Sequence, residues 1–107
     1  MAEPALDLSE LIDLYKADAR GMVAQMTAAL NRWTEVQAGG SARQELRKLS
    51  HQLRGSGRTY GFHQVTRICK AMENIIQKLE KQKCNADERV RQLLQQKIER
   101  LTAVFAA

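Results

Sequence analysis

Apolar residues recur along this chain at the three- and four-residue intervals of an amphipathic helix, in four successive stretches. The first stretch follows Asp7 and carries Leu8, Leu11, Ile12, Tyr15, Ala19, Met22, Met26, Leu30 and Trp33. Asp7 with Glu10 makes a capping pair at its start, and Gly21 is a candidate break within it. The pattern predicts either one long helix or two helices divided at Gly21.

Glycines and capping residues mark the boundaries of the second stretch. Gly39-Gly40 predicts the end of the first stretch, and Ser41 with Gln44 is typical of the start of a helix. The second stretch covers 41–59, and its apolar positions are Ala42, Leu46, Leu49 and Leu53. Tyr60-Gly61 predicts its end.

The third and fourth stretches have the same helical period. The third is an unbroken apolar stripe formed by Val65, Ile68, Cys69, Met72, Ile75, Ile76 and Leu79. Asn85 with Glu88 is another capping-box pattern, and the last stretch carries Val90, Leu93, Leu94, Ile98, Leu101 and Val104. Four amphipathic helices joined by short connections bury their stripes most economically in an antiparallel arrangement. We therefore predict an all-α fold: an antiparallel up-and-down four-helix bundle with an N-terminal helical extension.

Length and composition bound the class of protein. The 107 residues are enough for one core and too few for two, so we expect a single domain over 1–107, with 1–6 a flexible N-terminus. The content of 44% hydrophobic and 27% charged residues argues against a disordered chain. No apolar run reaches the length of a membrane span, and Met1-Ala2-Glu3-Pro4 does not resemble a signal peptide. We expect a cytoplasmic protein.

Cysteines and net charge add little to this picture. Cys69 falls on an apolar stripe, where a free thiol behaves as a small hydrophobe. The count allows a disulfide with Cys84, but two positions about four turns apart on one helix cannot meet. The net charge of +5 favours an acidic surface on a partner without saying which kind of partner.

His51 lies on the polar face of the second stretch. At about 100° per residue, the apolar residues fall within about 60° of Leu46, whereas His51 falls at about 140°. The imidazole should therefore project into solvent. Basic residues share this outer arc: Arg47, Lys48, Arg54 and Arg58. Their concentration around His51 indicates a local preference for anions.

Gly55 follows His51 by one helical turn and lies on the same outer side. A glycine inside a helix costs roughly 1 kcal/mol relative to alanine, so a compensating role is expected. Without a side chain at this position, a large partner can bring a reactive group close to the imidazole. An exposed imidazole is largely neutral near pH 7 and can attack an acyl phosphate, giving a phosphohistidine. Arg54 is placed to pair with the phosphate oxygens.

The segment His51-Gln52-Leu53-Arg54-Gly55-Ser56-Gly57, followed by Gly61, resembles the signature of histidine-containing phosphotransfer (HPt) domains. The family pattern is His, any residue, Leu, Lys or Arg, Gly and two small residues, with another Gly ten positions after the histidine. The stretch from Ile68 to Glu73 resembles the family's next helix, so the resemblance extends over nearly the whole chain. It implies that His51 accepts a phosphoryl group from a receiver-domain aspartate and passes it to another receiver. Arg54 would then be the basic phosphate neighbour and Gly55 the clearance residue.

The resemblance also implies a phosphocarrier and not an enzyme. Receiver partners supply the magnesium ion and the acidic pocket, so we expect no cofactor, ATP site or metal site in this chain. The sequence agrees, since it has no Gly-rich phosphate loop, paired cysteine ligands or H-E-x-x-H motif. The expected partners are receiver domains, a sensor histidine kinase or both, with no membrane or nucleic acid, and the expected oligomeric state is a monomer.

Docking residues are less well defined by the sequence. Arg47, Lys48 and Arg58 are either docking contacts or ordinary solvated charges. A receiver should also need an apolar patch beside His51, for which Tyr60, Phe62 and residues of the first helix are candidates. His63 falls near the start of the third helix and is left out of the site.

Two other functions stay open at this point. The first is a regulatory helical bundle that binds a kinase or receiver without passing on phosphate. The second is a basic nucleic-acid-binding helical protein, since the sequence pI is about 9.6. Acidic residues interrupt the third and fourth helices, which argues against the wide basic stripe that the second function needs.

Overall fold

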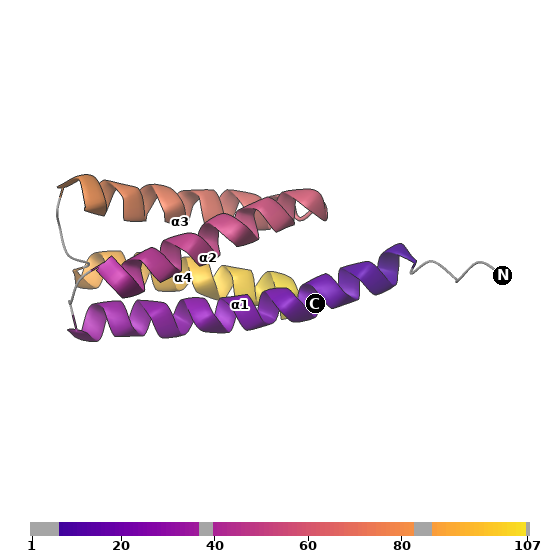
Figure 1. The fold of residues 1–107 in the computed structure, drawn as a ribbon, viewed down its shortest axis with the longest axis horizontal. Coiled ribbons are helices and arrows are strands. Elements are labelled where there is room, and N and C mark those ends of the chain that lie inside the picture. Colours follow the sequence, from indigo (N-terminus) through magenta and orange to yellow (C-terminus); the bar gives the residue numbers. More distant parts are fainter. Residues whose placement is uncertain (1–6, 37–39, 83–86, 107) are drawn as a thin grey trace.

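The chain folds into four helices in a computed structural model that describes residues 7–36, 40–82 and 87–106. The helices are α1 (Leu8–Val36), α2 (Gly40–Thr59), α3 (His63–Gln82) and α4 (Glu88–Ala106). They run alternately in opposite directions along one long axis (Figure 1). This arrangement confirms the predicted all-α antiparallel bundle.

Each helix packs against two others. α2 contacts α1 on one side and α3 on the other, and α4 contacts the remaining sides of α1 and α3, which leaves α2 and α4 diagonally opposed. The outward side of α2 is therefore free of other helices and open to a partner.

One hydrophobic core runs through the bundle. Its fully buried side chains come from all four helices and include Met26, Leu53, Met72 and Leu101. Of the apolar positions expected for α2, Leu46, Leu49 and Leu53 are buried as the period predicted, and Ala42 is partly buried against the core. Ser50 is the buried polar residue of α2, and its hydroxyl donates a hydrogen bond to the carbonyl oxygen of Leu46 at 2.8 Å. That bond satisfies a polar group that would otherwise be costly inside the core.

α1 continues without interruption through Gly21, so the possible division at this residue is wrong. The core accounts for the continuity: Ala19 and Val23 on either side of the glycine are buried, and their packing outweighs the poor helix propensity of one residue. With 29 residues, α1 is longer than the other helices, and its first turns project beyond them (Figure 1). These turns are the predicted N-terminal helical extension.

Aromatic packing anchors the base of this extension to the bundle. Tyr15 is buried, stacks on Tyr60 with ring centroids 4.4 Å apart, and contacts Phe62 and Phe105. The hydroxyl of Ser56 donates a hydrogen bond to the Tyr15 hydroxyl oxygen at 3.2 Å. Burial raises the pKa of the Tyr15 phenol. These contacts hold the exposed first turns of α1 beside the end of α2.

Asp7 caps α1 as predicted. Its carboxylate accepts a hydrogen bond from the backbone N–H of Glu10 at 2.8 Å, and this bond lowers the pKa of Asp7. The expected cap of α2 is wrong: the helix already includes Gly40, so Ser41 lies inside it. Gly40 can adopt helical backbone angles as readily as those of a turn, which makes this boundary ambiguous in the sequence.

A different residue from the expected one caps α4. Asn85 lies outside the described residues, and the helix begins only at Glu88. The carboxylate of Asp87 accepts the backbone N–H of Val90 at 2.9 Å and so fills the capping position. Asparagine and aspartate cap helices about equally well, so their order in the sequence did not identify which of them would do so.

Gly61 ends α2 as the sequence predicts, and it does so with a positive φ of 81°. The backbone N–H of Phe62 donates to the carbonyl of Gly57 at 2.7 Å, and that of Gly61 donates to the carbonyl of Arg58 at 3.3 Å. This is a Schellman C-cap, which needs a left-handed residue that glycine provides at little cost. The turn directs α3 back along α2.

Gly57 lets α2 and α3 approach closely just before this turn. It is buried, and a Cβ atom at this position would lie 3.0 Å from Cγ1 of Val65 on α3. Gly57 therefore lies on the core side of α2, where a larger residue would push the two helices apart.

None of the described helices combines the length and apolar character that crossing a membrane requires. Cys69 is a free thiol in the core, and burial raises its pKa to about 12. Cys84 and residues 1–6 lie outside the described part of the chain, as do the expectations that concern them.

Candidate functional site

His51 projects from the outward side of α2, with 67% of its side chain exposed. The apolar residues two positions before and after it, Leu49 and Leu53, are buried on the opposite side. The helical-wheel prediction of a solvent-facing imidazole is therefore confirmed.

Glu73 of α3 holds one edge of the imidazole ring. Its Oε1 atom lies 3.1 Å from Nδ1 of His51, and its Oε2 atom accepts a hydrogen bond from Nη1 of Arg54 at 2.9 Å. Nη2 of Arg54 is 3.5 Å from Nδ1 of His51. Only 16% of the Glu73 side chain is exposed, so this carboxylate has a fixed position between the histidine and the arginine.

This contact has a direct chemical consequence for the ring. Glu73 is closer to Nδ1 than Arg54 is, and a carboxylate can only accept hydrogen bonds, so this contact favours the tautomer with the proton on Nδ1. In the neutral ring, Nε2 then carries the free lone pair.

Three cations surround a shallow depression next to His51. The depression has a volume of about 450 Å³ and is lined by His51, Arg54, Gly55, Arg58, Thr66 and Lys70. Thr66 donates a hydrogen bond to the carbonyl of Arg54 at 3.3 Å, which ties α3 to α2 at this point. We call this the histidine depression. Its positive lining suits a small anion such as a phosphoryl group.

Gly55 leaves the depression open. A Cβ atom built on this residue would meet no atom within 4 Å, whereas one on Gly57, two positions later, would press on α3. The two glycines therefore differ in role: Gly55 keeps the space above the helix clear, and Gly57 permits close packing below it.

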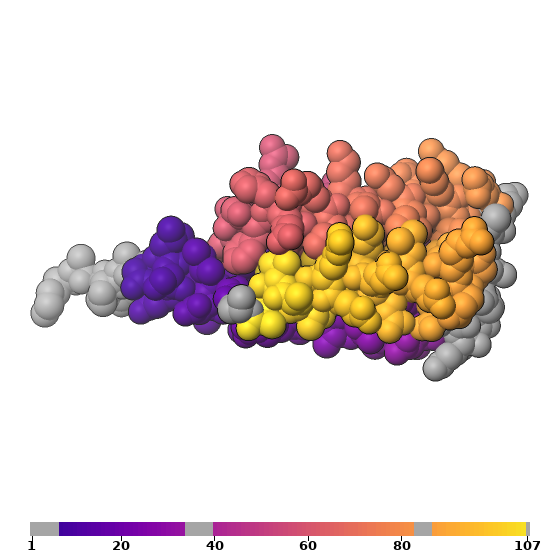
Figure 2. Space-filling model, turned by 180° about the vertical axis from the view of Figure 1, so that it is seen from behind, coloured from indigo at the N-terminus to yellow at the C-terminus, as the bar shows by residue number. Residues whose placement is uncertain are grey.

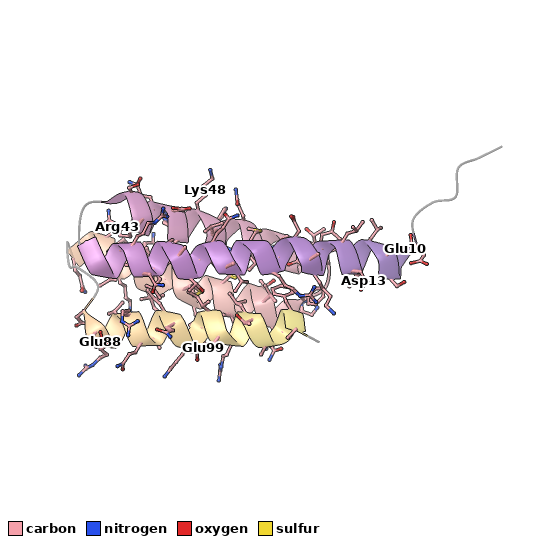
Figure 3. All side chains as sticks on the ribbon, turned by 90° about the horizontal axis from the view of Figure 1, so that it is seen from below. Glu10, Asp13, Arg43, Lys48, Glu88 and Glu99 are labelled. Atoms are coloured by element: carbon pink, nitrogen blue, oxygen red, sulfur yellow. The ribbon has the colours of Figure 1, made fainter. Side chains whose placement is uncertain are left out.

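The three candidate docking cations have different surroundings. Arg58 lines the histidine depression. Arg47 instead forms an ion pair with Glu80 of α3 at 3.0 Å, and Arg43 contacts the other carboxylate oxygen of Glu80. Lys48 is exposed and points away from the bundle (Figure 3). The structure thus brings only Arg58 of the three beside His51.

An apolar groove flanks α2 on the side of α1. Its volume is about 860 Å³, and its lining includes Leu11, Leu14, Tyr15, Gln52, Ser56 and Tyr60. Leu14 is 60% exposed, and Leu11 and Tyr60 are 37% and 39% exposed. We call this the leucine groove. Two of the expected sources of an apolar patch, the first helix and Tyr60, lie here, whereas Phe62 is half-buried in the aromatic cluster.

Sequence reasoning missed the contributions of α3. Glu73, Lys70 and Thr66 lie at spacings of three and four residues, so they share one edge of α3 beside its apolar stripe. That spacing was a detectable signal. It did not reveal which edge of α3 faces α2, because that depends on how the two helices pack.

The second helix of this four-helix bundle thus carries an exposed histidine, with a carboxylate on its Nδ1 atom and a depression lined by cations beside it. The family model for the Hpt domain matches residues 10–104. The match spans most of the chain, which therefore belongs to the Hpt domain family. Members of this family are phosphocarriers of two-component phosphorelays and interact there with receiver and kinase domains. Comparisons with curated proteins and with solved structures found no match.

Proposed function

We propose that this protein accepts a phosphoryl group on Nε2 of His51 from the phosphoaspartate of one receiver domain and passes it to the aspartate of another. The contact of Glu73 with Nδ1 of His51 carries this proposal, because it directs the lone pair of the exposed ring toward an incoming partner. The exposed ring and the vacant space above Gly55 supply the necessary access.

The transfer step needs no reacting groups other than His51 of this chain and the phosphoaspartate of the receiver. The Nε2 lone pair attacks phosphorus, a P–N bond forms, and the bond from phosphorus to the aspartate oxygen breaks with its electron pair, releasing the carboxylate. The ring becomes positively charged while its proton stays on Nδ1, and the Glu73 carboxylate stabilises that charge. Attack by the aspartate of the next receiver reverses these events and restores the neutral histidine.

The cations of the histidine depression stabilise the transferred group. Arg58 and Lys70 face the depression and make no ion pair within the described residues, so they are free to pair with phosphoryl oxygens. Arg54 already pairs with Glu73 and can share its second nitrogen with the phosphoryl group. Magnesium and the acidic pocket belong to the receiver in this scheme.

We propose that the receiver domain binds in the leucine groove. Its lining includes Gln52, the residue after His51 on α2, so an apolar surface bound there would lie beside the part of α2 that carries the imidazole. The cations of the histidine depression would face the acidic pocket of the same receiver. A small apolar contact with charged edges suits a transient complex.

The test is phosphoryl transfer from a panel of phosphorylated receiver domains to the purified protein. The matched variants are His51→Gln and His63→Gln, since His63 is the second exposed histidine and lies at the start of α3. We expect acid-labile, base-stable label on the wild type and on His63→Gln, and none on His51→Gln. Equal labelling of both variants would refute the assignment of His51.

Other outcomes favour the other functions. Receivers that bind the protein but never label it would indicate a regulatory bundle. If no receiver binds, and DNA or RNA binds with a steep salt dependence, the nucleic-acid function would replace the proposal.

A further inference from the structure

A second charged surface lies between α3 and α4. It is a groove of about 650 Å³ whose lining includes Arg67, Ile68 and Ala71 of α3 and Lys97, Arg100 and Val104 of α4. We call it the α3–α4 groove. Figure 2 looks onto this face, where α4 in yellow lies along α3 in pink to orange.

The cations of this groove have no acidic partners within the described part of the chain. Arg67, Lys97 and Arg100 take part in none of its ion pairs or side-chain hydrogen bonds. The acids that α3 does carry, Glu73 and Glu80, pair with groups of α2. On this side of α3 the positive charge is therefore uncompensated.

The acids of α4 form no ion pair with these cations within the described residues, and Glu99 lines a neighbouring depression together with Lys97 and Arg100. Glu88 pairs with Arg91 near the start of the helix. Glu99 accepts a hydrogen bond from the side chain of Gln95 on its own helix. Lys97 and Arg100 meanwhile lie three residues apart on one face, where like charges repel. This arrangement lowers the stability of the free protein and leaves three cations available. The surface is therefore well suited to binding an external anion.

The floor of the groove is apolar. Ile68 is 7% exposed, and Ala71 and Val104 are half-buried beside it. Ala71 carries only a methyl group, which leaves space between the longer side chains of the rims. The shape therefore combines a small hydrophobic floor with positive rims on both sides.

This groove is separate from the histidine depression. Ala71 lies two residues before Glu73, which places it about 160° around α3 from the carboxylate that contacts His51. α4, which forms the other wall, is diagonally opposite α2 in the bundle. A segment bound in the groove would leave His51 and the leucine groove uncovered.

We propose that the α3–α4 groove binds an acidic amphipathic segment of a partner protein, with apolar side chains on the floor and carboxylates against Arg67, Lys97 and Arg100. Complementary charge and the apolar floor both favour such a segment. A nucleic acid fits less well, because the groove has no aromatic side chain for stacking and only a short basic surface. The proposal goes beyond phosphotransfer and does not depend on His51.

The test uses a designed 15-residue helical peptide with two central leucines flanked by glutamates, added to the 15N-labelled protein. A control peptide carries glutamine in place of every glutamate. We expect amide shifts to cluster over 64–71 and 97–104, and the glutamine peptide to bind at least tenfold more weakly. The groove variant is Arg67→Glu, Lys97→Glu, Arg100→Glu, and we expect it to lose at least tenfold in affinity.

A second triple variant controls for net charge. Lys78, Lys81 and Arg89 are exposed cations nearer the other ends of α3 and α4, and their replacement by glutamate changes the net charge equally. This control should bind the peptide less than threefold more weakly than the wild type. Equal losses in both triple variants, or shifts centred on α1 and α2, would overturn the proposal. So would tighter binding of single-stranded RNA or anionic vesicles at the same residues.

Two readouts separate this proposal from the proposed function. His51→Gln should bind the peptide as the wild type does, since its position is remote from the groove. The groove variant should still accept phosphoryl groups, which also shows that it is folded. Failure of one proposal therefore leaves the other intact.

Discussion

The carboxylate of Glu73 on α3 contacts Nδ1 of His51 on α2 at 3.1 Å, and its other oxygen accepts a hydrogen bond from Arg54. This relationship joins two helices at an exposed surface and favours the tautomer in which Nε2 of the ring carries the free lone pair. The most direct prediction tests that role.

Replacing Glu73 by alanine should lower the rate at which His51 accepts a phosphoryl group. Without the carboxylate the proton is no longer confined to Nδ1, and the charge of the phosphorylated ring loses its partner. We expect about a tenfold loss, equivalent to about 1.4 kcal/mol in the transition state. NMR of the imidazole nitrogens should show the Nδ1–H tautomer in the wild type and a shift toward Nε2–H in the variant. An unchanged tautomer with an unchanged rate would show that Glu73 is only structural.

Gly55 and Gly57 of α2 should respond oppositely to alanine. Gly55→Ala should raise the free energy of unfolding by about 0.5–1 kcal/mol, because the new Cβ meets open space and alanine is the better helix former. Gly57→Ala should lower it by about 1 kcal/mol or more, because its Cβ would press on Val65. Urea denaturation followed by circular dichroism measures both changes.

A longer side chain at Gly55 should separate stability from function. Gly55→Gln should fold as well as Gly55→Ala but accept phosphoryl groups at least tenfold more slowly, because its side chain would occupy the approach to His51. Single-turnover transfer from a phosphorylated receiver measures this rate. A Gly55→Gln rate equal to that of the wild type would contradict the clearance role.

A charge placed in the leucine groove should weaken receiver binding without affecting folding. Leu14→Asp should weaken receiver binding about tenfold, or about 1.4 kcal/mol, since it places a charge in an apolar contact. Leu14 is 60% exposed, so the free energy of unfolding should change by no more than about 0.5 kcal/mol. Leu93→Asp on α4 is the matched control and should bind normally in the same titration.

Because Cys69 is buried, the folded protein should lose stability at alkaline pH. Burial raises the pKa of its thiol to about 12 in the folded protein, whereas an unfolded thiol ionises near pH 8.5. The unfolded state therefore releases its proton first, so stability is complete below about pH 8.5 and falls as pH rises toward 12, with a limiting slope of about 1.4 kcal/mol per pH unit. Cys69→Ala should show a shallower loss over this range in chemical denaturation. Parallel curves for the two proteins would exclude the buried thiol as the cause.

The sequence by itself determined the properties that depend on one helix at a time. The apolar period specified four helices and the side of α2 from which His51 projects, because the rotation of 100° per residue is a local property of the backbone. Gly61 was recognisable as a helix end for the same reason, since a left-handed residue is a local requirement.

Tertiary structure decided the relationships between helices. The sequence placed Glu73, Lys70 and Thr66 on one edge of α3. The close approach of α2 and α3 at Gly57 and Val65 then brought that edge to His51. The same packing left Arg67 on the side of α4. The buried neighbours of Gly21 likewise kept α1 continuous against the local propensity. The rotation and separation of two packed helices depend on side chains that interlock across the core, and no local pattern within either helix contains that information.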